Sequence, residues 1–272
     1  MTRHTAQSGN VTLSYSVEGE GDQTVLLLMG LGGRAADWGE VFPSALARRY
    51  RVIRFDHRGV GGSPAVPGGY SLNDMAKDAT AVLDAARVER AHVVGYSMGG
   101  MISQLVATTH AERVDRLVLL STHFGGADTV PPTTEAMQLF DPKQMLSRGR
   151  SADAMMRFSM EILTAKGFLE RAPDALKQMV DNVRAEPTTP VAFLAQMQAI
   201  IGSDRSKIVR DIRKPTLVIH GTDDTLIPTG NGRLLNERIP GSRLEILPGV
   251  GHMPMLEAPD KLAELVLGFL GE

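Results

Sequence analysis

A serine between two glycines, in the sequence Gly-Tyr-Ser-Met-Gly at residues 95–99, is the clearest candidate for chemistry in this chain. The apolar run 91–94 before it has the length of a strand, and residues 98–107 after it carry apolar side chains at helical spacing. A tight turn from strand to helix lifts the hydroxyl of Ser97 above the sheet, beside the N–H groups and the positive dipole of the helix N-terminus. The flanking glycines are needed because side chains there would collide with the crossing backbone. This segment therefore predicts a nucleophilic serine.

Two later segments supply the partners that a nucleophilic serine requires. The apolar run 215–220 ends in a turn with Asp223 and Asp224, and His252 stands in a glycine- and proline-rich loop. A histidine takes the serine proton during attack, while an acid fixes the tautomer of the imidazole and stabilises the imidazolium. The order of serine, acid and histidine along the chain differs from that of both major groups of serine proteases.

Together these motifs resemble the α/β-hydrolase superfamily, from about residue 10 to the C-terminus. In that family the acid lies three residues after the glycine of the strand-end turn, which corresponds to Asp224 and leaves Asp223 as a neighbour. The resemblance therefore implies a catalytic triad of Ser97, Asp224 and His252.

The same resemblance implies an oxyanion hole that stabilises negative charge in the transition state. Its donors are expected to be the backbone N–H groups of Met98, directly after the nucleophile, and of Leu31, after the strand 24–29. Many relatives have His-Gly where this chain has Met29 and Gly30. Backbone donors survive that change, but any role of the usual histidine side chain is removed.

The hydrophobic pattern alternates between strands and helices and predicts an α/β fold with a parallel sheet. The resemblance implies the α/β-hydrolase fold, with a mostly parallel central sheet and helices on both faces. The later strands are near-continuous in Val, Leu and Ile, which is typical of strands covered on both faces. Helices are expected at about 40–49, 71–87, 98–110, 229–239 and 259–270. The expected strands are Val11–Ser16, Val25–Met29, Arg51–Phe55, His92–Tyr96, Leu117–Leu120, Thr216–His220 and Leu244–Leu247.

Residues 124–205 break this alternation of strands and helices. They contain helical segments separated by prolines and show no strand pattern. The α/β-hydrolase family commonly carries a helical cap at this place, so the resemblance implies that the segment covers the serine. The expected domains are a core of residues 1–123 and 206–272 and a helical cap of residues 124–205. Half of the chain's 14 methionines lie in this cap, and such flexible side chains favour an apolar substrate. Met155, Met156 and Met160 are candidates for the pocket, with the last two on one helix face. The seven cap methionines are Met137, Met145, Met155, Met156, Met160, Met179 and Met197.

Composition agrees with an enzyme that acts on small molecules. With 272 residues, 43% of them hydrophobic, the chain can bury a large core as one domain with an insertion. Its formal net charge of −2 and its lack of long basic runs favour neither nucleic acid nor an anionic membrane as a partner. The chain has no cysteine, which excludes disulfides and thiolate catalysis. Its first residues lack the apolar core of a signal peptide, so we expect a cytoplasmic protein, with homo-oligomers left open.

Other polar residues do not predict a cofactor site. The glycine-rich stretch 30–34 lacks the lysine of a phosphate loop and the spacing of a dinucleotide motif, and no His/Asp/Glu set has metal-ligand spacing. We therefore expect neither a cofactor nor a metal. His57, Arg58 and His220 are expected to be structural groups, whereas His123 follows a strand and is a candidate to line the pocket.

The function predicted from these residues is that of a serine hydrolase that cleaves a carboxylic ester or lactone, with an apolar small molecule as substrate. A serine at 97 argues against dehalogenases and epoxide hydrolases, which use aspartate there. Met253 follows His252 where carbon–carbon hydrolases usually have tryptophan, which disfavours that reaction. The alternatives are a cofactor-free perhydrolase of the haloperoxidase kind, a non-hydrolytic enzyme of natural-product synthesis, or a small-ligand receptor on the same fold. Steady turnover of p-nitrophenyl esters would distinguish an enzyme from a receptor.

Overall fold

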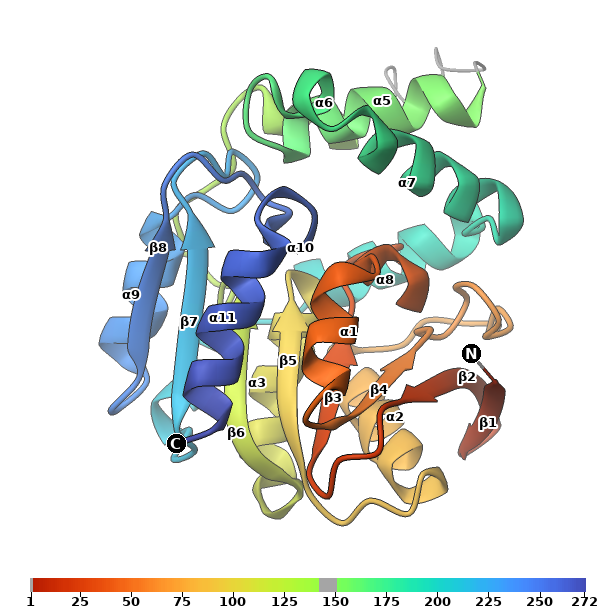
Figure 1. Cartoon of the computed structure of the whole chain (residues 1–272), viewed down its shortest axis with the longest axis vertical. Helices are drawn as coiled ribbons and strands as arrows, with labels where there is room; N and C mark the ends of the chain where they lie inside the picture. Colours follow the sequence, from red (N-terminus) through yellow and green to blue (C-terminus); the bar gives the residue numbers. More distant parts are fainter. Residues whose placement is uncertain (1, 142–150) are drawn as a thin grey trace.

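The computed structural model describes residues 2–141 and 151–272, which contain an eight-stranded sheet in the order β1-β2-β4-β3-β5-β6-β7-β8 (Figure 1). The pairs β1–β2 and β2–β4 are antiparallel, and every other neighbouring pair is parallel. This confirms the predicted mostly parallel sheet. The strands are β1 (Arg3–Ser8), β2 (Val11–Glu18), β3 (Thr24–Leu28), β4 (Arg51–Phe55), β5 (Ala91–Tyr96), β6 (Val114–Leu120), β7 (Thr216–Gly221) and β8 (Arg243–Leu247).

Helices cover both faces of this sheet because strand side chains alternate between two apolar clusters. Leu26 and Leu28 point into one cluster, with α2 (Leu72–Ala85), α3 (Met98–Thr109) and α9 (Gly230–Arg238). Val25 and Leu27 point into the other, with α1 (Val41–Ala47) and α11 (Pro259–Leu270). Figure 1 shows α1 and α11 in front of the sheet and α3 behind it. These five helices agree with the predicted segments to within a few residues.

Two strands at the edges of the sheet differ from the sequence-based expectation. β1 was not predicted, because its sequence Arg-His-Thr-Ala-Gln-Ser is polar and mostly exposed; it is held by antiparallel pairing with β2. The expectation that the late strands are covered on both faces is wrong for β8, whose residues 243–246 alternate between exposed and half-buried. Edge position explains both differences, since each of these strands has a neighbour on one side alone.

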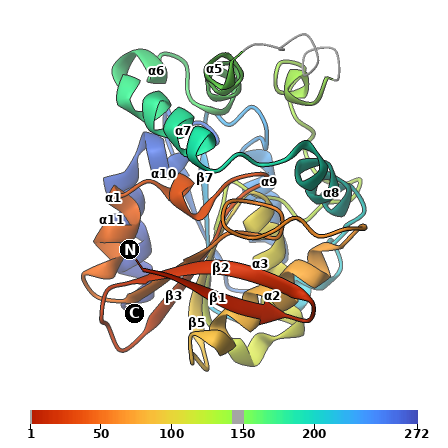
Figure 2. The same cartoon turned by 90° about the vertical axis from the view of Figure 1, so that its right-hand side faces the viewer.

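The described residues of the segment 124–205, which are 124–141 and 151–205, form helices joined by loops and contain no strand. Its two ends meet, because Arg205 N–H donates to Phe124 O at 2.7 Å. Figures 1 and 2 place α5, α6 and α7 beyond the end of the sheet toward which β5 points. Pro142 and Met145 lie outside the described residues. The helices are η3 (Ala136–Phe140), α5 (Ala152–Leu163), α6 (Phe168–Arg171), α7 (Pro173–Ala185) and α8 (Pro190–Ile201).

The helices of residues 2–141 and 151–272 include none with both the length and the apolar character needed to cross a membrane.

The contact between α3 and β3 generates a prediction for stability. A Cβ atom at Gly99 would lie 2.0 Å from the carbonyl oxygen of Leu28, whereas one at Gly268 in α11 would meet no atom within 4 Å. Gly99→Ala should therefore lower the free energy of unfolding by about 3 kcal/mol, as overpacking does. Gly268→Ala should raise it by about 0.5–1 kcal/mol, because alanine stabilises an exposed helix. Urea unfolding measures both changes, and equal stability of the two variants would contradict this packing.

Candidate active site

Ser97 lies in the turn between β5 and α3 with φ 53° and ψ −118°. A positive φ is uncommon for a residue with a Cβ atom and persists where the surrounding structure enforces it. Here the close approach of α3 to the end of β5 enforces this backbone conformation. A Cβ atom at Gly95 would lie only 2.4 Å from Gly99 O. The carbonyl oxygen of Ser97 also accepts a hydrogen bond from the hydroxyl of Thr122 at 2.7 Å. The turn thus holds the Ser97 side chain in one orientation.

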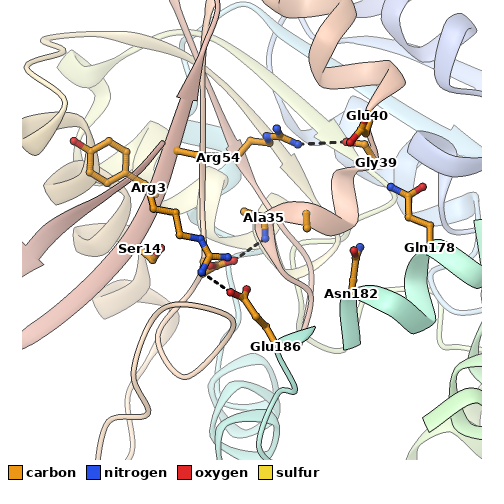
Figure 3. A pocket seen from close by; sticks show the side chains of 13 residues that line it. Arg3, Ser14, Ala35, Gly39, Glu40, Arg54, Gln178, Asn182 and Glu186 are labelled. Atoms are coloured by element: carbon orange, nitrogen blue, oxygen red, sulfur yellow. Dashed lines mark hydrogen bonds and ion pairs between the residues drawn. The ribbon is translucent and has the colours of Figure 1, made fainter. Parts of the chain in front are cut away.

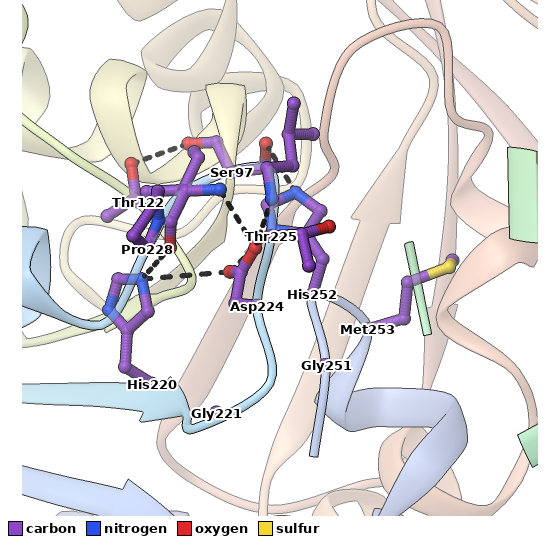
Figure 4. A network of polar contacts seen from close by, with 12 residues as sticks. Ser97, Thr122, His220, Gly221, Asp224, Thr225, Pro228, Gly251, His252 and Met253 are labelled. Atoms are coloured by element: carbon purple, nitrogen blue, oxygen red, sulfur yellow. Dashed lines mark hydrogen bonds and ion pairs between the residues drawn. The ribbon is translucent and has the colours of Figure 1, made fainter. Parts of the chain in front are cut away.

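Ser97, His252 and Asp224 form a hydrogen-bonded chain across three separate loops (Figure 4). His252 Nε2 lies 3.2 Å from Ser97 Oγ, and His252 Nδ1 lies 2.8 Å from Asp224 Oδ2. A carboxylate accepts hydrogen bonds, so it favours the tautomer with the proton on Nδ1 and leaves Nε2 to accept the Ser97 proton. The ring of Tyr96 packs beside the imidazole, at 5.1 Å between ring centroids.

Asp224, and not its neighbour, is the acid that faces His252. Its Oδ1 accepts hydrogen bonds from the N–H groups of Leu226 (3.0 Å) and Ile227 (2.8 Å), which fix the carboxylate in the turn after β7. The side chain of Asp224 is fully buried, whereas Asp223 is exposed. His220 Nε2 lies 3.7 Å from Oδ2, but burial lowers the pKa of His220 and so disfavours a competing cation.

Glu257 holds the loop that carries His252, and the sequence analysis missed it. Its carboxylate accepts hydrogen bonds from the N–H groups of Gly251 (2.9 Å) and Met253 (3.1 Å), on either side of the histidine. It also accepts one from Ala165 N–H at 2.7 Å, in the helical segment. Burial raises the pKa of Glu257, and these donors act in the opposite direction. The available sequence signal was an acidic residue five positions after His252 in the otherwise apolar stretch 253–258. In the structure Glu257 ends the short helix α10 (Pro254–Glu257).

The two residues expected to supply the oxyanion hole, Met98 and Leu31, lie in segments that border Ser97. Met98 is the first residue of α3, so its N–H has no partner within the helix. Leu31 lines the cavity in front of Ser97, and the loop before it passes close by, since a Cβ atom at Gly30 would lie 3.2 Å from Ser97 Cβ. Both N–H groups therefore belong to segments that border the serine.

A cavity of about 270 Å³ opens onto Ser97 and His252 and has a mostly apolar lining. Met156 and Met160 of α5 both line it, which agrees with their predicted shared face. Met155 is 42% exposed and lies outside the lining, so the prediction that it lines the pocket is wrong. The reason is that adjacent residues of a helix, here Met155 and Met156, point in different directions. Further apolar side chains of the lining belong to Met29, Leu139, Phe140, Met179, Phe193 and Leu226.

The remaining predicted polar residues have structural partners. His57 is fully buried and contacts a backbone carbonyl oxygen at 3.0 Å, and Arg58 forms an ion pair with Asp78 at 2.6 Å. His123 lies outside the cavity lining, so the expectation that it lines the pocket is wrong. Burial lowers the pKa of both His57 and His123 to about 4. Among the residues that the structure describes, no group of acidic and histidine side chains is arranged to hold a metal ion.

A second cavity, of about 310 Å³, lies between β2, β4 and α7 (Figure 3). Its two arginines are already paired, Arg3 with Glu186 and Arg54 with Glu18. The described lining includes no histidine. Its described lining therefore has no serine–histidine pair of the kind found at Ser97.

The chain matches the model of the alpha/beta hydrolase fold family over residues 23–259 and therefore belongs to this family. It is 31% identical to the putative carbamate hydrolase RutD of Azorhizobium caulinodans, over 98% of each chain. It is 30% identical to the 2-hydroxy-6-oxononadienedioate/2-hydroxy-6-oxononatrienedioate hydrolase of Paraburkholderia xenovorans, over 96% of this chain and 91% of that protein. Among solved structures, the enol-lactonase from Burkholderia xenovorans matches with a TM-score of 0.85 and 26% identity, over 99% of this chain and 100% of that one. These relatives are hydrolases with different substrates.

The adjacent acids allow a matched test of the site. Asp224→Asn should lower kcat by roughly 10³–10⁴-fold, because an amide no longer enforces the tautomer that leaves Nε2 free to accept a proton. Asp223→Asn should change kcat by less than about threefold, as expected for an exposed position. Steady-state kinetics with a p-nitrophenyl ester measures both variants. Equal losses, or a larger loss for Asp223→Asn, would show that the acid is misassigned.

Proposed function

We propose that this protein is a serine hydrolase that cleaves a carboxylic ester or lactone through an acyl-enzyme. The observation that carries the proposal is the hydrogen-bonded chain from Ser97 Oγ through His252 to the buried Asp224. In this assignment Ser97 is the nucleophile, His252 the general base and acid, and Asp224 the group that orients the imidazole. The N–H groups of Leu31 and Met98 are the oxyanion donors.

The proposed reaction has two halves. Ser97 Oγ attacks the carbonyl carbon while its proton passes to His252 Nε2, and the carbonyl oxygen becomes an oxyanion between the two N–H donors. Collapse of this intermediate breaks the bond to the alkoxy group, which leaves with the proton from His252. Water then attacks the acyl-enzyme by the same route, which releases the carboxylic acid and restores Ser97.

We assign residues 124–205 as a cap over a core domain of residues 1–123 and 206–272. Two observations support this division: the hydrogen bond between Arg205 and Phe124, which closes the insertion at its base, and the shared cavity. The cavity is lined by Ser97 of the core and by Met160 and Phe193 of the segment above it. Selection of the acyl or alcohol group is therefore attributed to the cap.

The cavity favours a neutral, apolar substrate. Its charged lining residues are Arg34 and Asp37, which form a buried ion pair at 2.9 Å. The Arg34 guanidinium also donates to Glu186 O and the hydroxyl of Thr188, so each of its three nitrogens already has a partner within the protein. A carboxylated substrate would have to break these contacts, whereas an alkyl chain can pack against the methionines. The enol-lactonase among the structural relatives supports a lactone as one such substrate.

Carbamate hydrolysis is the second candidate, favoured by the name of a relative at 31% identity. It uses the same attack by serine on a carbonyl carbon. The apolar lining favours the longer esters and lactones, so a panel of alkyl esters, lactones and carbamates compared by kcat/KM discriminates between the two candidates.

The nucleophile is tested by Ser97→Ala. We expect kcat toward p-nitrophenyl butyrate to fall roughly 10⁴–10⁶-fold, because the oxyanion donors and substrate binding alone remain. A fluorophosphonate should label the wild-type protein at Ser97 and leave the variant unlabelled, and the variant's thermal unfolding should match the wild type. Retention of more than a few per cent of the activity would reject the proposed nucleophile.

The role of the cap is tested with methionines on one helix. Met156→Ala or Met160→Ala should change the ratio of kcat/KM for octanoate and acetate esters by about 10–200-fold, which corresponds to about 1–3 kcal/mol, because alanine removes hydrophobic contacts with the longer chain. The matched control is Met155→Ala, whose side chain points to solvent and should leave the ratio unchanged. Equal losses on both esters for Met156→Ala and Met160→Ala would mean that these methionines do not select substrate.

A further inference from the structure

The loop that carries Leu31 is a tight turn with a defined geometry. Gly33 N–H donates to Gly30 O at 3.2 Å, which closes the turn over residues 30–33. Gly32, at the third position, has a φ of 66°, the signature of a type II turn. The Leu31 N–H belongs to the first peptide of this turn. Its direction therefore depends on how firmly the turn is held.

Two side chains of the cap hold this turn at Gly32, one through the N–H of Gly32 and the other through its carbonyl oxygen. Gly32 N–H donates to Gln196 Oε1 at 2.8 Å, and Gly32 O accepts a hydrogen bond from the Thr188 hydroxyl at 2.8 Å. The ring of Phe193 packs against the same residue, since a Cβ atom at Gly32 would lie 3.0 Å from Phe193 Cδ2. Three side chains from residues 188–196 thus converge on one glycine of the core.

Gln196 is fully buried on α8, although it is more than 160 positions from Gly32 in sequence. Its Nε2 donates to Arg58 O at 3.4 Å, in the loop after β4. Burial of an amide is unfavourable unless its donor and acceptor are both satisfied. The two core partners fix the orientation of the amide, because Gly32 N–H requires an acceptor and Arg58 O requires a donor. Gln196 therefore joins two core loops from the cap side.

We propose that Gln196 is a positioning residue of the oxyanion hole, supplied by the cap. Gln196 and Thr188 hold the two peptides that flank Gly32, and the Leu31 N–H lies in the neighbouring peptide on the N-terminal side. Without the Gln196 acceptor, the peptide between Leu31 and Gly32 is free to rotate. Such a rotation changes the backbone angles of Leu31 and shifts its N–H from the place where the oxyanion forms. A misplacement of about 1 Å can lower a rate a hundredfold. This inference rests on the proposed function, because it assumes that Leu31 N–H stabilises the transition state.

The test compares Gln196→Met with Gln198→Met, a matched change at an exposed position of the same helix. Gln196→Met keeps the length of the side chain and removes the acceptor. We expect kcat per fluorophosphonate-titrated site to fall roughly 10–100-fold, by the same factor for acetate and octanoate esters. KM should change by less than about threefold, and binding of an alkyl boronic acid, which mimics the tetrahedral intermediate, should weaken with kcat. Gln196→Glu keeps an acceptor and should retain more activity than Gln196→Met, while Gln198→Met should match the wild type.

A second variant keeps the proposal testable if Gln196→Met does not fold. Thr188→Val removes the other contact with Gly32 at a half-buried position and should lower kcat per titrated site in the same chain-length-independent way. If wild-type Ser97 is not labelled, the proposed function fails. If Ser97 is labelled and both Gln196→Met and Thr188→Val keep the wild-type kcat per site, the positioning role alone is overturned. A change confined to KM or to the preference between esters would also overturn it.

Discussion

The first turn of α3 packs directly against the carboxyl ends of β3 and β5, and the rest of the site depends on this contact. A methyl group at Gly99 would overlap the backbone of Leu28, and one at Gly95 would overlap Gly99 itself. The chain between them must therefore turn within one residue, and Ser97 takes the positive φ that this requires. The same contact places the N-terminal end of the α3 dipole next to the serine hydroxyl, where negative charge would develop.

Around this fixed serine, the partners come from loops that other parts of the chain hold in place. Asp224 is fixed by two backbone N–H groups of its own turn, and the His252 loop is fixed by Glu257. The segment 124–205 also takes part, because His252 N–H donates to Leu163 O at 2.7 Å. Through Gln196 it contacts the opposite side of the site as well. The proposed cap therefore both shapes the cavity and helps to hold the proposed catalytic groups.

The sequence was most informative where a local pattern determines the position. Strand length, helical spacing and the turn residues after a buried strand predicted the sheet and the candidates at its edge. The resemblance to α/β-hydrolases then selected Asp224 and joined it with Ser97 and His252. Gln196 could not be found in this way, and the sequence marked Glu257 only as an acidic residue in an apolar stretch. Gln196 contacts a glycine more than 160 residues away, and Glu257 bonds Ala165 across 92 residues; no periodicity encodes such partners.

The central claim is that Ser97 forms an acyl-enzyme. Its most direct measurement is mass spectrometry of the protein mixed with p-nitrophenyl butyrate and quenched in acid within milliseconds. The account predicts a mass increase of one butyryl group on the intact chain, located after digestion in the peptide that contains Ser97. A Gln196→Met sample should show the same site of modification. Turnover without any acylated intermediate under rapid quench, or a butyryl group on another residue, would contradict the account.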